Sequence, residues 1–248
     1  MEVRPVVSHD ATGHHTPPRE HHRDVQGGAA RAAVFGISDG LLTNVSLILG
    51  VAGASPGGGI VRLAGLAGLV AGAFSMAAGE YVSMSAQKEL LERELELERR
   101  ELERNPETET RELAATFERR GLDHTDARRI AETIMLDPEV ALEVHAAEEL
   151  GIRPSQTGAP LSAAISSFFS FALGAVIPLL PWFFTSGSAA VIASVVLGAV
   201  SALAIGWTVA VFTDRSRIRS ALRQLAIAAV AAAVTYGIGT AVGVRTAG

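Results

Sequence analysis

Cysteine is absent from this sequence of 248 residues, and the absence excludes several kinds of site. Disulfide scaffolds, zinc ribbons, CxxC redox motifs and thiol nucleophiles all need cysteine side chains. Asp, Glu, His and Met are then the candidate metal ligands, a set that favours Fe²⁺ or Mn²⁺ over metals bound by thiolates. The sequence also contains no HExxH, no Glu-x-x-His of the ferritin type, no GxSxG and no Walker A motif. We therefore predict that the protein is not an enzyme and holds no tightly bound cofactor.

Lysine and aromatic residues are scarce. Only Lys88 is a lysine among the 21 Lys and Arg residues, a bias typical of a GC-rich, bacterial genome, and aromatic residues make up 5%. The formal net charge of −5 at pH 7 gives no support to nucleic-acid binding, so we expect no nucleic-acid partner.

Long apolar runs dominate most of the chain. Five of them have 20 or more residues, at 32–54, 63–82, 161–184, 189–212 and 225–244. A helix needs about 20 apolar residues to cross a bilayer core about 30 Å thick. A buried helix of a soluble protein would explain one such run, but not five. The sequence therefore predicts an all-α membrane protein with five transmembrane helices.

Arginines near the ends of these runs predict the orientation in the membrane. The N-terminal side and the loop between the fourth and fifth runs have Arg19, Arg23, Arg31, Arg215, Arg217, Arg219 and Arg223, whereas the opposite side has Arg62 and Arg245. Because positively charged loops stay in the cytoplasm, we expect a cytoplasmic N-terminus and a C-terminus outside. We expect an integral protein of a bacterial plasma membrane, with a disordered cytoplasmic tail at 1–30 that contains five of the seven histidines.

Between the second and third runs the composition changes to an acidic, charged segment. Residues 86–150 contain 19 of the 26 acidic and 10 of the 21 basic residues, a net charge of −9. The abundance of Glu, Leu and Arg predicts helices at 87–104, 107–120 and 125–150, the last interrupted near Asp137-Pro138. No helix breaker precedes residue 87, so the second membrane helix can continue straight into the first of these.

These patterns divide the chain into four parts. A tail at 1–30 precedes transmembrane helices 1–2 at 31–85, and transmembrane helices 3–5 follow at 156–248. Between them lies a three-helix cytoplasmic domain at 86–155, called the insert below.

Two carboxylates lie inside the predicted membrane helices. Charged side chains at membrane depth are costly and usually face a pathway or a partner. Asp39 lies about 10 Å into the first run, and Glu80 lies near the cytoplasmic end of the second. Met76 shares a helix face with Glu80, because the two are four residues apart. We interpret Asp39, Met76 and Glu80 as a translocation path; the alternative is a Glu80 that only reaches the interface and a Met76 that only packs.

Two small-residue motifs, Gly36-xxx-Gly40 and Gly68-xxx-Gly72, flank these positions. Such motifs let membrane helices approach closely. They fit packing within one chain and a dimer seam equally well.

Pairs of potential metal ligands make the insert a candidate metal-binding domain. The pairs share helix faces by their spacing of three or four residues, and they are Glu98 with Glu101, Glu109 with Glu112, and His145 with Glu149. Oxygen donors with an occasional imidazole suit Fe²⁺, Mn²⁺, Mg²⁺ or Ca²⁺. The alternative is a solvated helix surface on which Glu and Arg pair four residues apart.

The membrane motifs resemble those of vacuolar iron transporter proteins. The stretch RAAVFGISDGL at 31–41, with Asn44 and GVAGA at 50–54, is similar to their first helix. SMAAGEYVS at 75–83 resembles their second helix. The Glu-x-x-Glu pairs, together with EELG at 148–151, resemble their metal-binding domain.

This resemblance implies a homodimer of five-helix chains that exports Fe²⁺, often with Mn²⁺, from the cytosol in exchange for protons. It implies a path at the dimer seam, lined by residues that match Asp39 and Met76. It also implies that the insert holds metal ions near the entrance on Glu98, Glu101, Glu109, Glu112 and Glu149. Members often have methionines shortly before the last of these glutamates, where this chain has His145-Ala146. Divalent metal ions, protons and the lipid membrane are the partners that it implies.

Two other functions stay open. A transporter of Mn²⁺ alone, or of a proton-coupled organic ion, would use the same helices. A membrane scaffold or signalling protein whose acidic insert binds a partner would also fit, although it leaves Asp39 without a purpose inside the membrane.

Overall fold

The computed structural model describes residues 28–54, 57–149, 151 and 159–246, so nearly all of the predicted tail at 1–30 lies outside the described residues. The described residues form helices and contain no strand, which confirms the all-α class. The helices are α1 (Gly28–Ala54), α2 (Gly58–Arg104), α3 (Pro106–Arg119), α4 (His124–Ile134), α5 (Pro138–Glu149), α6 (Pro160–Leu179), α7 (Pro181–Phe184), α8 (Gly187–Phe212) and α9 (Arg217–Thr246).

Five of these helices, α1, α2, α6, α8 and α9, are long and apolar enough to cross a membrane, and this confirms the five predicted spans. The third predicted run differs in one respect, because its helix is divided in two. Pro181 has no backbone N–H to continue the ladder, so α6 ends at Leu179 and the short helix α7 follows. Trp182 on α7 is fully buried and donates a hydrogen bond to Ser194 on α8 (Nε1 to Oγ, 2.9 Å), which fixes α7 against the bundle.

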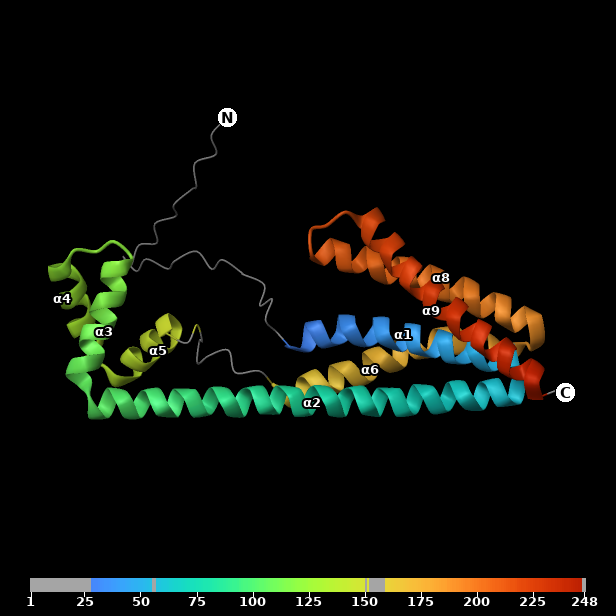
Figure 1. Cartoon of the computed structure of the whole chain (residues 1–248), viewed down its shortest axis with the longest axis horizontal. Helices are drawn as coiled ribbons and strands as arrows, with labels where there is room; N and C mark the ends of the chain where they lie inside the picture. Colours follow the sequence, from blue (N-terminus) through green and yellow to red (C-terminus); the bar gives the residue numbers. More distant parts are fainter. Residues whose placement is uncertain (1–27, 55–56, 150, 152–158, 247–248) are drawn as a thin grey trace, which may run out of the picture.

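The helix α2 runs without a break through the membrane part and into the insert (Figure 1). Its 47 residues correspond to about 70 Å, which is more than twice the thickness of a bilayer core. The helices α1 and α6 pack along one half of α2, and α3, α4 and α5 lie toward its far end (Figure 1). The charged half of α2 is therefore the support on which the insert is built.

Prolines set the helix boundaries of the insert. Pro106 is the first residue of α3, directly after the Asn105 that ends α2, and Pro138 is the first residue of α5. The predicted helix at 125–150 is two helices, α4 and α5, and the chain turns between them next to Asp137-Pro138. Asp123 caps α4, because its side chain accepts hydrogen bonds from the backbone N–H groups of Thr125 and Asp126.

The helix α1 is central to the membrane part and contacts α2, α6, α8 and α9. Its closest neighbour is α6: a Cβ on Gly40 would lie 2.1 Å from the carbonyl oxygen of Phe171 on α6. A Cβ on Gly68 of α2 would likewise lie 2.4 Å from Leu47 of α1. The glycines of both motifs therefore face helices of the same chain. Of the two alternatives that the sequence left open, packing within one chain and a dimer seam, the structure shows the packing within one chain.

Candidate metal centre

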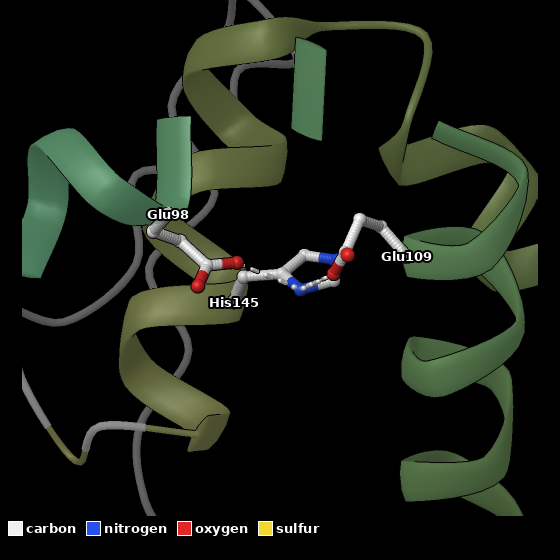
Figure 2. Close-up of side chains that lie close together, drawn as sticks. All are labelled: Glu98, Glu109 and His145. Atoms are coloured by element: carbon white, nitrogen blue, oxygen red, sulfur yellow. Dashed lines mark ion pairs between the residues drawn. The ribbon is translucent and has the colours of Figure 1, made fainter. Parts of the chain in front are cut away.

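Three helices bring two carboxylates and one imidazole of the insert together. Glu98 lies on the charged half of α2, Glu109 in the first turns of α3, and His145 in the middle of α5. Figure 2 shows the His145 ring between the two carboxylates, which approach it from opposite sides. The turn at Asn105-Pro106 makes this possible, because it redirects the chain from α2 into α3.

The three side chains are close and buried. His145 Nδ1 lies 3.3 Å from Glu98 Oε1 and 3.8 Å from Glu109 Oε2. One potential ligand atom from each residue lies within 4.8 Å of the other two. The exposed fractions of the residues are 0% for His145 and 6% for each glutamate. This spacing and burial suit a single cation held between them.

Polar atoms of this cluster lack hydrogen-bond partners. Both ring nitrogens of His145 and the Oε1 atom of Glu98 are buried without one. The 3.3 Å contact between Nδ1 and Oε1 is an ion-pair distance without hydrogen-bond geometry. Leaving such groups unpaired costs free energy, and a cation bound to Glu98 Oε1 and to one nitrogen of His145 would give both of those atoms a partner.

The electrostatics of the cluster favour binding of a cation. Burial, and then the negative charges of Glu149 and Glu109, raise the pKa of Glu98 to about 7. Burial, and then Glu112 and Glu149, also raise the pKa of Glu109. Burial lowers the pKa of His145, which keeps the imidazole neutral and its lone pair free for a metal. A divalent cation would offset the carboxylate repulsion that contributes to these raised pKa values.

A second group of carboxylates leads from this buried cluster to the surface. Glu109, Glu112 and Glu149 also place one oxygen each within 4.8 Å of one another, and the last two are exposed. Glu149 Oε1 lies 3.7 Å from His145 Nδ1, so the two groups are continuous. The structure thus unites five of the six residues predicted in the insert. Glu101, the sixth, is exposed and belongs to neither group, although its charge contributes to the raised pKa of Glu98.

The predicted path residues lie apart from this centre, in the membrane part. Asp39 is half-buried on α1 and accepts a hydrogen bond from Thr43 (Oγ1 to Oδ1, 3.4 Å). Met76 packs against the apolar cluster formed by Ala73, Phe171 and Ala175. Glu80 forms an ion pair with Arg31 of α1 (NH2 to Oε1, 2.5 Å). Among the described residues, neither Asp39 nor Glu80 belongs to a group of three or more His, Asp or Glu side chains that could hold a metal ion.

Two polar residues of the membrane part were not among the predicted site residues. Asn44 of α1 is fully buried, and its Nδ2 donates to the Ala175 carbonyl of α6 at 2.6 Å while its Oδ1 has no partner. Arg31 is the partner of Glu80. The sequence could have pointed to Arg31 as a partner of Glu80, because both lie at the same end of the membrane. It contained no sign that Asn44 is buried.

Comparison with known proteins matches the same stretch of chain. A family model described as "VIT family" matches residues 30–240, which include all five spans for most of their length and the whole insert. The chain is 32% identical over 217 residues to "Vacuolar iron transporter 1" of Eucalyptus grandis, covering 87% of each chain. It is 38% identical over 227 residues to "Vacuolar iron transporter" of Acanthamoeba castellanii, covering 89% of this chain and 82% of that one. It is also 30% identical over 221 residues to "Vacuolar iron transporter 1" of Arabidopsis thaliana, covering 88% of each.

Proposed function

The chain belongs to the VIT family, and from this premise we propose that it transports Fe²⁺, and Mn²⁺ as well, out of the cytosol in exchange for protons. Members of this family are transporters, so the protein is not an enzyme. The relatives named above are called iron transporters, which supports iron as the metal.

One observation carries the proposal: the buried cluster of Glu98, Glu109 and His145. Two carboxylates and a neutral imidazole that place ligand atoms within 4.8 Å of one another, with Glu98 Oε1 and both nitrogens of His145 unpartnered, are a poor arrangement for a structural core. They are a good arrangement for a borderline divalent cation, since oxygen and imidazole donors together suit Fe²⁺ and Mn²⁺. In this proposal, the exposed Glu112 and Glu149 collect the metal, Glu101 adds to the negative field, and the buried cluster holds it.

The metal then moves along the membrane part. In the proposed path, it passes from the insert to Glu80 and Met76 on α2 and then to Asp39 on α1. Glu80 is engaged by Arg31, so a metal ion that reaches Glu80 must exchange with the guanidinium. The exposed face of α1 contains Phe35, Asp39 at its edge, and Thr43. We place the seam of a homodimer along this exposed face of α1, because Gly36 and Gly40 on another face of the helix already contact α6.

Proton exchange follows from the chemistry of the ligands. A carboxylate binds metal only in its deprotonated form, so each metal ion displaces protons from the groups that it binds. With the N-terminus and the insert in the cytoplasm and the C-terminus outside, metal leaves the cytosol as protons return. The arginine distribution supports this orientation, and the scarcity of lysine supports a bacterial plasma membrane.

The test is metal uptake by proteoliposomes that contain the purified protein and a metal-sensitive dye, under a pH gradient. We expect the protein to carry Fe²⁺ and Mn²⁺ and to move protons in the opposite direction. Asp39→Asn is expected to abolish this flux while the protein still inserts, as is Asp39→Ala, and Asp214→Asn, at an exposed turn, serves as the control. Normal Fe²⁺ flux through Asp39→Ala would overturn the path. Flux of Mn²⁺ alone would restrict the substrate, and no flux of any metal would favour the scaffold.

A further inference from the structure

An apolar groove lies between α8 and α9, next to the turn that joins them. It has a volume of 390 Å³ and is lined by Leu203, Ala204, Trp207, Ile218, Ala221 and Leu222. Gly206 explains why the groove forms, because a Cβ there would come within 2.6 Å of the carbonyl oxygen of Ser220. The two backbones therefore touch at Gly206, and the larger side chains on either side of this contact become the walls.

The groove opens at a strongly basic end of the membrane part. The segment 213–224 contains Arg215, Arg217, Arg219 and Arg223 against one acid, Asp214. All four arginines are exposed, and none of them forms an ion pair with any carboxylate of the described residues. Figure 1 shows the α8–α9 turn at the end of the membrane part that faces the insert.

The turn places this charge directly against the groove. Asp214 has a φ of 49°, and the N–H of Arg215 donates to the Ala210 carbonyl at 3.1 Å, so the chain reverses within four residues. Arg217 becomes the first residue of α9, and its guanidinium carbon lies 5.6 Å from the centre of the Trp207 ring. The cation thus lies over a wall of the groove, at the positive end of the dipole of α9.

We propose that this groove and its arginines bind an anionic glycerophospholipid. One acyl chain would lie in the groove against Trp207, Ile218 and Leu222, and the phosphate would contact Arg217 and its neighbours. The apolar lining of the groove suits an acyl chain. The positive charge of the arginines at the membrane boundary, which pairs with no carboxylate of the described residues, favours an anionic headgroup over a zwitterionic one. This site is separate from the metal centre and the path, and it does not depend on the proposed transport.

Trp207 provides a direct reporter of the occupant. It is 46% exposed in the groove, while the other tryptophan, Trp182, is fully buried. The full-length protein is placed in nanodiscs that contain equal small fractions of phosphatidylglycerol or phosphatidylcholine with brominated acyl chains, which quench nearby tryptophan. Subtracting the signal of Trp207→Phe isolates the contribution of Trp207.

We expect phosphatidylglycerol to quench Trp207 at a several-fold lower fraction than phosphatidylcholine, since each arginine near the surface favours an anionic lipid by about fivefold. The double variant Arg217→Gln/Arg219→Gln is expected to lose this preference. The control Arg128→Gln, on α4 of the insert, is expected to retain it. In the unmodified protein, high salt is expected to weaken the preference, which provides a test without any substitution.

Two outcomes would overturn the proposal. Equal quenching by the two lipids would show that the arginines select no headgroup. Quenching by neither lipid would show that protein covers the groove, whether a second copy of this chain or another polypeptide.

Discussion

Replacing Glu98 by glutamine is expected to stabilise the metal-free insert at alkaline pH while it weakens metal binding. The pKa of Glu98 is raised from 4.5 to about 7, so the folded protein holds this proton more tightly than the unfolded chain does. Stability is therefore lost as the pH rises from 4.5 through 7, and the full cost of the buried charge is present at pH 8. The difference between the two pKa values corresponds to about 3 kcal/mol.

Glutamine removes that charge but leaves a buried amide. An amide without a full set of partners costs about 1 kcal/mol, so the expected net stabilisation at pH 8 is about 2 kcal/mol. At pH 5, where Glu98 is protonated in the folded protein, the advantage of glutamine is expected to disappear. At pH 8, the metal-free insert would thus be more stable in a variant that binds metal poorly, because metal binding favours a charged side chain at position 98 and stability favours an uncharged one.

Hydrogen–deuterium exchange of peptides from α3 and α5, measured on the full-length protein with a chelator, tests this expectation. A stabilisation of about 2 kcal/mol slows exchange through local opening by about 30-fold at pH 8. Glu103→Gln, at an exposed position of the same helix, is the matched control and should change nothing. Exchange in Glu98→Gln as fast as in the unmodified protein at pH 8, or a difference that is the same at pH 5, would refute the reasoning.

Three further predictions concern proton release, the imidazole and the packing of α1. Binding of Mn²⁺ is expected to release more protons at pH 6.5 than at pH 8, because Glu98, with a pKa of about 7, and Glu109, whose pKa is also raised, are more protonated at the lower pH. Calorimetry in two buffers of different ionisation enthalpy measures the total release, and release independent of pH would contradict this expectation. His145→Ala is expected to weaken Mn²⁺ binding about tenfold or more in the same titration, whereas the exposed His124→Ala should bind normally, and equal affinities would exclude His145 as a ligand. Gly40→Ala would force α1 away from α6, which is expected to cost about 2 kcal/mol or more of stability. Size-exclusion chromatography should then show less folded protein than for the control Gly79→Ala, whose added Cβ meets nothing within 4 Å. Equal yields of the two variants would argue against this contact.

The sequence was sufficient for features that depend on composition or on local chemistry. The five apolar runs predicted the spans because a bilayer sets a minimum length, and prolines at 106 and 138 marked breaks that the helices obey. Helical spacing likewise paired Glu109 with Glu112 and His145 with Glu149, which lie together in the structure. These rules act within one helix, so they can be read from consecutive residues.

Features that depend on how helices meet were beyond the sequence. Spacing did not show that Glu98 and Glu109 reach opposite sides of His145 while Glu101 stays at the surface, since this depends on the angle at Asn105-Pro106. It did not assign the glycine motifs to contacts within the chain. It did not reveal that Arg31 pairs with Glu80, because the two lie 49 positions apart and meet only when α1 packs on the bundle.

The continuity of α2 places a limit on how its length can change. Glu80 and Glu98 are 18 residues apart on one helix, which is five full turns, so they point in about the same direction at a separation of about 27 Å. One inserted residue between them would rotate the whole insert by about 100° about the helix axis, whereas seven would return it to within about 20°. Whether an insertion or deletion in this stretch of α2 is tolerated should therefore depend on the rotation that it gives the insert about the helix axis, and not on the number of residues added or removed.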